Sequence, residues 1–330
     1  MKIQPGWHVA IDSSELKPHR PLAVRRFGID WVFWRDTSGD PVMMEDRCPH
    51  RSARLSLGVV NQAGSGSLRC PYHGIEFDGR GRCVHVPELQ RSAPGLGVPT
   101  LPCVEAHGFV WVWVGDGRVE QATVPWFENL GPGFVHSRID AQWPTHFSRW
   151  IENELDVTHL PFVHASTIGR GFDPAVPSRF EFDERGILIL FDQKDPSNRA
   201  HQFARLLYPN IWQLAVSPTM FLVMAFAAID DEHTQLYFRT YRSFGRLPLV
   251  KPVVDIFVNA FNRKVVAQDR RVVLSQQPRS SGVASGEVLF KEDAAVRHYR
   301  SLMPGFIEPL ASRHEAPVRF QRAAVTNAPN

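Results

Sequence analysis

The sequence has no long apolar segment, and its basic residues form no dense run. The longest apolar stretch, Met220 to Ile229, is far shorter than the roughly 20 residues of a membrane-spanning helix. Residues 1–10 contain one lysine and no apolar core, which argues against a signal peptide. The net charge is only +3, whereas nucleic-acid-binding surfaces carry clustered Lys and Arg. We therefore expect a cytoplasmic protein whose partners are neither membranes nor nucleic acids.

Nucleotide-binding signatures and abundant cysteines are missing as well. The sequence contains no G-x-G-x-x-G and no P-loop, so it does not bind a nicotinamide cofactor by that route. Only four cysteines occur: Cys48, Cys70, Cys83 and Cys103. Nothing in the sequence indicates an oxidising compartment in which they would form disulfides. Because Cys48 and Cys70 stand close to histidines, metal binding is the better interpretation of this pair.

The chain length of 330 residues suggests about two domains. The first third is rich in short β patterns. Residues 31–34 and 42–45 flank a turn at 37–40, and residues 109–114 form a strand that ends in Gly-Asp-Gly. A stretch punctuated by Pro and Gly follows from 125 to 144. We place the boundary near 118, which divides the chain into domains 1–118 and 119–330.

The second domain is predicted to combine antiparallel strands with helices. Residues 180–182 and 187–191 flank a hairpin turn, and further strands are expected at 206–216, 220–229 and 234–244. A long helix is predicted from Pro252 to Gln277, with an apolar stripe toward the core. The stripe consists of Val254, Phe257, Val258, Phe261, Val265 and Val272. The fold class that follows is α+β.

The first group of metal-binding residue types lies in the first domain. Cys48-Pro-His50 is followed, after nineteen residues, by Cys70-Pro-Tyr-His73. Thiolates and imidazoles together suit zinc or an iron–sulfur cluster. Structural zinc sites mostly pair cysteine with cysteine, or histidine with histidine, on each arm, whereas here each arm carries one of each. In a two-iron cluster, two histidines raise the reduction potential and make the cluster a moderate electron relay. We therefore favour the cluster over zinc.

A second group lies in the segment Glu-Asn-Glu-Leu-Asp156-Val-Thr-His159-Leu-Pro-Phe-Val-His164. Asn153, Asp156 and His159 are spaced by three residues and would share one helix face. Pro161 would interrupt that helix and turn His164 back toward His159. Two convergent histidines beside a carboxylate begin a two-histidine, one-carboxylate iron site. A capped helix with incidental histidines is the alternative interpretation.

The third ligand of such a site would come from the long predicted helix. Asp269 lies on its apolar stripe, four residues after Val265 and three before Val272. A carboxylate that faces a core is costly unless a metal or counter-ion accompanies it. Asp255 is the competing candidate, nearer the start of the helix. We favour Asp269.

At these residues the chain resembles a known family. Cys48-Pro-His50-Arg-Ser-Ala and Cys70-Pro-Tyr-His73-Gly resemble the cluster-binding motif of Rieske proteins, over roughly residues 5–117. The D-x2-H-x4-H pattern that begins at Asp156 resembles the iron motif of Rieske non-haem iron oxygenases. The resemblance extends over nearly the whole chain. It is strongest to homotrimeric monooxygenases such as the saxitoxin-pathway oxygenases, caffeine N-demethylases and dicamba O-demethylase.

This resemblance implies a fold, two cofactors and a set of roles. It implies a Rieske β domain followed by a helix-grip-like antiparallel sheet with helices. A [2Fe-2S] cluster would be bound by Cys48, His50, Cys70 and His73, and a mononuclear Fe(II) would be bound by His159, His164 and Asp269. Asp156 would be a catalytic bridge, hydrogen-bonded to His159 and to the neighbouring subunit's His73. The assembly implied is a head-to-tail homotrimer.

The activity implied is reductive activation of O2 with electrons from NAD(P)H, delivered by a ferredoxin and/or flavin reductase. We expect monooxygenation or oxidative demethylation of a small aromatic, alkaloid or other natural product. The alternatives are a cis-dihydroxylating dioxygenase and a Rieske protein that only transfers electrons. One strand carries residues that either line the substrate pocket or belong to the ordinary core: Asn210, Trp212, Leu214 and Val216.

Overall fold

The computed structural model describes residues 1–61, 66–115, 119, 123–191, 202–282 and 285–307. Four antiparallel sheets make up the β structure of these residues, and helices accompany the largest sheet. The predicted α+β class is confirmed. The domain boundary predicted at 118 lies outside the described residues and stays a prediction.

The N-terminal part consists of three small sheets. The first has the order β1-β11-β10, the second β2-β3-β4-β9, and the third β5-β6-β7-β8. Their strands are β1 (Gly6–Asp12), β2 (Leu22–Arg26), β3 (Ile29–Arg35), β4 (Pro41–Glu45), β5 (Val59–Asn61), β6 (Ser67–Arg69), β7 (Glu76–Phe77), β8 (Cys83–His85), β9 (Thr100–Leu101), β10 (Cys103–Ala106) and β11 (Phe109–Val114). The β patterns predicted for residues 31–34, 42–45 and 109–114 are therefore confirmed.

The C-terminal part is built on one seven-stranded antiparallel sheet with the order β12-β18-β17-β16-β15-β14-β13. Its strands are β12 (Val135–Trp143), β13 (Ser178–Asp183), β14 (Gly186–Phe191), β15 (Phe203–Leu207), β16 (Ile211–Ser217), β17 (Met220–Ala228) and β18 (Thr234–Arg242). The single strand predicted for 206–216 is wrong, because the chain turns at residues 208–210 and divides it into β15 and β16. Pro209 in that turn cannot donate to a sheet ladder.

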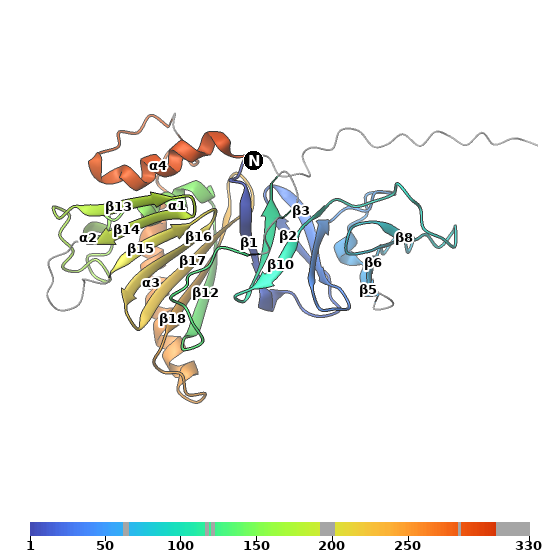
Figure 1. The fold of residues 1–330 in the computed structure, drawn as a ribbon, viewed down its shortest axis with the longest axis horizontal. Helices are drawn as coiled ribbons and strands as arrows, with labels where there is room; N and C mark the ends of the chain where they lie inside the picture. The colour runs from blue at the N-terminus through green and yellow to red at the C-terminus, as the bar shows by residue number, and fades with distance from the viewer. Residues whose placement is uncertain (62–65, 116–118, 120–122, 192–201, 283–284, 308–330) are drawn as a thin grey trace, which may run out of the picture.

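The helices of the C-terminal part are α1 (Phe147–Leu155), α2 (Leu160–Val163), α3 (Lys251–Val273) and α4 (Ala294–Leu302). Short 3-10 helices are η1 (Ser13–Glu15), η2 (Leu55–Leu57), η4 (Lys291–Asp293) and η5 (Met303–Gly305). Helix α3 runs along one face of the seven-stranded sheet (Figure 1), as in a helix-grip arrangement. It ends at Val273, four residues before the predicted Gln277, and beyond that end the Ser275 hydroxyl donates to the Val272 carbonyl at 2.6 Å.

Strand β17 explains how the two parts of the chain fit together. All of its side chains after Met220 are buried, because both faces of the sheet are covered. Leu222, Met224 and Phe226 point into the core shared with the helices. Phe221 and Val223 point the other way, into a core formed with β1 and β11. A strand that is covered on both faces has apolar side chains on both faces and therefore a continuous apolar sequence. This burial explains the apolar run at residues 220–229.

The apolar stripe predicted on the long helix is only partly correct. The buried face of α3 follows Asn262, Val265, Val266, Asp269 and Val273. Phe257 is 72% exposed and Phe261 is 47% exposed, because both lie to the side of that face. Among the described residues, no helix is both long enough and apolar enough to cross a bilayer.

Candidate metal centres

The four cluster-motif residues lie on two loops with the same local geometry. In the first loop, the Cys48 N–H donates to the Ala53 carbonyl, and the Ser52 N–H donates back to the Cys48 carbonyl, both at 2.8 Å. In the second, Cys70 bonds Ile75 in the same way at 2.8 Å, and the Gly74 N–H donates to the Cys70 carbonyl at 3.1 Å.

The fourth residue after each cysteine has a positive φ, 58° at Ser52 and 71° at Gly74. Glycine suits the second loop, because an added Cβ would lie only 3.1 Å from Pro87. The two loops therefore share one backbone turn, although the histidine is the second residue after the cysteine in the first loop and the third in the second.

These loops place the two thiols inside the protein and the two imidazoles near its surface. Cys48 and Cys70 are buried, His73 is half-buried and His50 is exposed. The two imidazole ring centres lie 4.7 Å apart. Burial raises the pKa of Cys48 to about 11, assisted by the neighbouring Cys70 thiol and opposed by backbone N–H groups of the loop. A metal cluster would supply the positive charge that these thiols need in order to ionise.

The second motif does not form the single helix that the spacing predicts. Helix α1 ends at Leu155, and Asp156 follows in an extended conformation. The Asp156 carboxylate accepts hydrogen bonds from the Thr158 N–H at 2.8 Å and from the Thr158 hydroxyl at 2.6 Å. Such local bonds compete with helical ones, which explains why the chain turns here. The shared helix face predicted for Asn153, Asp156 and His159 is therefore wrong.

The turn nevertheless brings Asp156 and His159 together. The Asp156 Oδ2 lies 3.8 Å from the His159 Nδ1. His159 and His164 flank the one-turn helix α2, whose second residue is Pro161. Proline is tolerated there because the backbone N–H groups of the first helical turn have no acceptor within the helix. The N–H that proline lacks would therefore have made no helical hydrogen bond. The predicted role of Pro161 as an interruption of a longer helix is thus replaced by a role in starting a short one.

His159, His164 and Asp269 form the convergent group predicted from the sequence. The Asp269 Oδ1 lies 2.8 Å from the His164 Nε2 and 3.6 Å from the His159 Nε2. Possible ligand atoms of the three residues all lie within 4.8 Å of one another. Asp255, the competing candidate, is elsewhere on α3 and pairs with Arg242 at 2.7 Å and Lys251 at 2.6 Å.

The hydrogen bonds around His164 fit a bound cation. The His164 Nδ1 lies 3.0 Å from the Gln268 Oε1, which also accepts from the Thr167 hydroxyl at 2.8 Å. A carbonyl oxygen only accepts, so Nδ1 carries a proton, and when the ring is neutral its Nε2 offers a lone pair to a metal ion. That lone pair faces a carboxylate oxygen, and a metal ion between two acceptors would satisfy both. Gln268 was not identified from the sequence.

The surroundings of the two histidines shift their pKa values in opposite directions. Burial lowers the pKa of His159 and outweighs the opposing effect of Asp156 and Asp269. Burial also acts to lower the pKa of His164, but its bond to Asp269 outweighs burial and raises that pKa. The buried His159 Nδ1 has no hydrogen-bond partner among the described residues. It is aimed at Asp156, which is one third exposed.

Glu154 is a second residue that sequence reasoning missed. It is buried and lines the same small cavity as the two histidines and Asp269. Burial raises the pKa of its carboxyl well above the usual range, and the negative charge of Asp269 adds to the effect. Both effects favour the protonated form of this carboxyl. The sequence signal was present, since Glu154 follows Trp150 by four residues and Ile151 by three, a spacing that places it on the apolar face of α1.

Two cavities share part of their lining, and the convergent group lines the inner one. The inner one measures about 30 Å³ and includes Trp212 and Leu214 in its lining. The outer one measures about 260 Å³ and includes Val216. Asn210 lines neither cavity, because its side chain bonds to the Val9 backbone at 3.1 and 3.2 Å. Of the four strand residues considered as pocket lining, three therefore line it and Asn210 joins the two parts of the chain.

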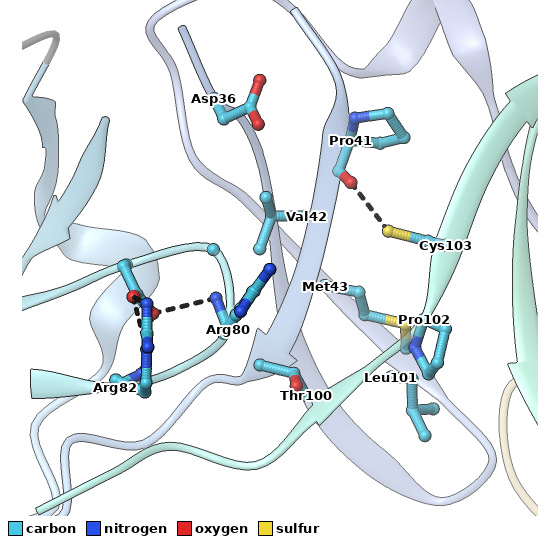
Figure 2. Close-up of a pocket in the computed structure, with 12 residues that line it drawn as sticks. Asp36, Pro41, Val42, Met43, Arg80, Arg82, Thr100, Leu101, Pro102 and Cys103 are labelled. Atoms are coloured by element: carbon cyan, nitrogen blue, oxygen red, sulfur yellow. Dashed lines mark hydrogen bonds and ion pairs between the residues drawn. The ribbon is translucent and has the colours of Figure 1, made fainter. Parts of the chain in front are cut away.

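A larger hollow lies in the N-terminal part, away from both groups of metal-binding residue types. It measures about 620 Å³ and is open to solvent. Figure 2 shows Cys103 on one side of it, donating from Sγ to the Pro41 carbonyl at 2.8 Å, and Arg80 and Arg82 on the other. Burial raises the pKa of Cys103 to about 12. This thiol is therefore a structural hydrogen-bond donor, and the hollow contains none of the predicted ligands.

Comparisons with known proteins agree with both centres. The Rieske [2Fe-2S] domain matches residues 6–105, and the C-terminal domain of vanillate O-demethylase oxygenase matches residues 143–216. Chlorophyllide a oxygenase of Chlamydomonas reinhardtii is 34% identical over 84% of this chain and 45% of its own length. The chain spans about half the length of the curated relatives it matches.

Solved structures give the same result for the fold. NdmA of Pseudomonas putida CBB5 is similar with a TM-score of 0.73 and 26% identity, over 90% of this chain and 88% of that one. Dicamba monooxygenase, solved with dicamba, has a TM-score of 0.71 and 20% identity over 92% of this chain and 96% of its own.

The two family matches include the four cluster-motif residues and both histidines of the convergent group. The individual ligand roles of these residues stay predictions. The cofactors of such a protein are a [2Fe-2S] cluster and, in the catalytic domain, a mononuclear iron. The chain therefore belongs to the Rieske oxygenases.

Proposed function

We propose that this chain is the oxygenase component of a Rieske non-haem iron system that hydroxylates or oxidatively demethylates a small organic substrate. The convergence of His159, His164 and Asp269 around one point carries this proposal. Two imidazoles and one carboxylate leave open positions on an iron, and iron bound there would supply the reductive activation of O2. A protein that only transfers electrons needs the cluster residues but has no use for this second group.

The residues around the convergent group have supporting tasks. Gln268 orients the His164 imidazole through its Nδ1, and Asp156 faces the His159 Nδ1. Partners of this kind fix the ring orientation and raise the basicity of a ligating imidazole. Apolar side chains such as Phe191, Leu222 and Met224 line the inner cavity and exclude water from it.

The arrangement of one chain supports electron transfer between subunits. The sheet β5-β6-β7-β8, next to the cluster loops, and helix α2 lie at opposite ends of the molecule (Figure 1). Electron transfer from the cluster of one copy to the iron of another would avoid that distance. We propose a head-to-tail homotrimer, because a heterologous contact gives a ring when its rotation closes and a trimer is the ring that the family resemblance implies. Asp156 would be the bridge, and a ferredoxin and/or flavin reductase would supply the electrons.

The cavities favour a compact apolar substrate. Their walls are mostly aliphatic and aromatic, and the Glu154 carboxyl, whose protonated form is favoured by burial, donates one hydrogen bond when it is protonated. Among the similar structures, NdmA has been solved with caffeine and dicamba monooxygenase with dicamba. We propose a substrate with an apolar body and a hydrogen-bond acceptor that faces Glu154.

Metal analysis of anaerobically purified protein tests this function. We expect about three irons and two acid-labile sulfides per chain, the sum of a two-iron cluster and one mononuclear site. About two irons would indicate a protein that only transfers electrons, and zinc without labile sulfide would overturn the proposal. Turnover with isotopically labelled O2 then separates the outcomes, since a monooxygenase incorporates one labelled atom into product and a dioxygenase incorporates two.

A further inference from the structure

The first half of α3 and the loop before it expose an unusual number of large apolar side chains. We call this surface the α3 patch, and it consists of Leu247, Leu249, Val253, Ile256, Phe257 and Phe261. Their exposed fractions are 69%, 90%, 54%, 67%, 72% and 47%. Single exposed apolar residues are common on soluble proteins, but a contiguous group marks an interaction surface.

The segment of chain that carries the α3 patch has more basic than acidic residues. Residues 243–264 contain Arg246, Lys251, Arg263 and Lys264 and a single acidic residue, Asp255. That carboxylate is already paired with Arg242 and Lys251. Arg263 and Lys264 are exposed and stand on α3 directly beyond Phe261. An apolar face bordered by basic residues complements a layer that is apolar inside and anionic at its surface.

The α3 patch is also one wall of the route to the convergent group. Phe257 and Phe261 line the outer cavity as well as the surface. Ile168, Leu222 and Val265 line both the outer and the inner cavity. An apolar molecule that left a lipid layer at the α3 patch would therefore meet mostly apolar walls before it reached His159 and Asp269. The polar lining of the outer cavity is Thr240 and Asn262, and the Asn262 side chain donates to the Thr240 hydroxyl at 2.7 Å.

We propose that the α3 patch docks this protein on an anionic lipid surface, so that an apolar substrate passes from the lipid into the cavities. The docking is inferred from the exposed apolar residues and the basic residues beside them. The route for substrate also rests on the proposed function. A membrane partner was not expected from the sequence, because no segment is long enough to span a bilayer. Docking on a surface does not need such a segment.

Flotation of the full-length protein with lipid vesicles tests the docking without any turnover. We expect the protein to float with vesicles of phosphatidylcholine and phosphatidylglycerol, and less with phosphatidylcholine alone. The double variant Leu249→Ser/Ile256→Ser should weaken binding by at least about tenfold, because two apolar anchors are lost. The variant Arg263→Gln/Lys264→Gln should lose the preference for anionic vesicles. Val288→Ser/Phe290→Ser removes two side chains that are 79% and 73% exposed elsewhere and should float like the parent protein.

Three results would overturn the proposal. The first is that the parent protein floats with neither type of vesicle. The second is that the control variant loses binding as strongly as the α3 variant. The third is that Leu249→Ser/Ile256→Ser lowers the molar mass measured by light scattering, which would identify the α3 patch as a contact between copies of this chain. Iron content measured on the same samples shows separately whether the proposed function holds, since these substitutions leave the ligands in place.

Discussion

Asp269 and Asp255 stand on the same helix, but their surroundings predict opposite results for their removal. Asp269 faces the two histidines, so Asp269→Ala should lose the mononuclear iron and all turnover while the visible spectrum of the cluster stays unchanged. Asp255 instead pairs with the buried Arg242, so Asp255→Ala should keep the iron and lose about 1–3 kcal/mol of stability. Iron analysis and thermal unfolding of both variants check this. Loss of iron from Asp255→Ala alone would show that the ligand assignment is wrong.

Substitution of Gln268 should weaken iron binding less than substitution of Asp269, because Gln268 contacts His164 and would not ligate the iron itself. Gln268→Leu removes the acceptor of the His164 Nδ1 proton and should weaken iron binding by about 10–100-fold. Titration of the metal-depleted protein with Fe(II) under anaerobic conditions measures this. Gln276→Leu changes an exposed glutamine beyond the end of α3 and should bind iron like the parent protein. Equal iron affinity in Gln268→Leu and the parent protein would contradict the orienting role.

At the scale of elements, a buried ion cluster joins β1 to β12 and β18. Asp12, at the end of β1, pairs with Arg239 of β18 at 2.6 Å and with Arg138 of β12 at 2.5 Å. Burial acts to raise the pKa of Asp12, but hydrogen bonds from Ser14 and Arg239 outweigh it and lower the pKa from 3.8 to about 2. The two parts of the chain are thus held together by charge as well as by the apolar core beneath β17.

This ion cluster predicts a stability that depends on pH. Because the folded pKa of Asp12 is depressed, its contribution of about 2 kcal/mol is fully present above pH 3.8 and is lost as the pH falls toward 2. Asp12→Asn should therefore be destabilised at neutral pH by at least this amount, and the difference from the parent protein should shrink below about pH 4. Denaturant unfolding at several pH values measures it. A difference that stays constant down to pH 2 would mean that Asp12 does not titrate as described.

At the scale of the whole molecule, Asp156 tests the proposed assembly. Asp156→Asn keeps the size of the side chain but removes its negative charge, which faces the His159 Nδ1. We expect both iron centres to remain and the cluster to be reduced normally. Product formation should fall by about 100-fold, because electrons would no longer cross between subunits. Rapid mixing of the reduced protein with substrate and O2 follows the reoxidation of the cluster directly.

The control for this experiment is Asp231→Asn, at a carboxylate that is 70% exposed and distant from both histidines in the sequence. It should reoxidise and turn over like the parent protein. Normal reoxidation in Asp156→Asn would contradict the bridging role. A fully active monomer would contradict transfer between subunits altogether.

The sequence by itself determined the features whose parts lie close together in the chain. Each cluster loop carries its cysteine and histidine within three residues, and a turn of a few hydrogen bonds sets their geometry. The same holds for His159 and His164 on either side of α2. Even here the sequence analysis missed one local hydrogen bond. The Thr158 N–H donates to the Asp156 side chain, and this bond ends the helix that the spacing predicts.

Only the tertiary structure decided which distant residues join these local units. Asp269 bonds to His164 across 105 positions of sequence, and Gln268 meets the same ring only because α3 lies along the sheet beside α2. The tertiary structure also turned Asn210 toward Val9 and left Phe257 on the surface. The spacing of apolar residues in a helix predicts which side chains share a face. The elements that pack against the helix decide which part of that face is buried. That is why local spacing could pair His159 with His164, while the position of Asp269 beside them, the contact with Gln268 and the α3 patch required the packed chain.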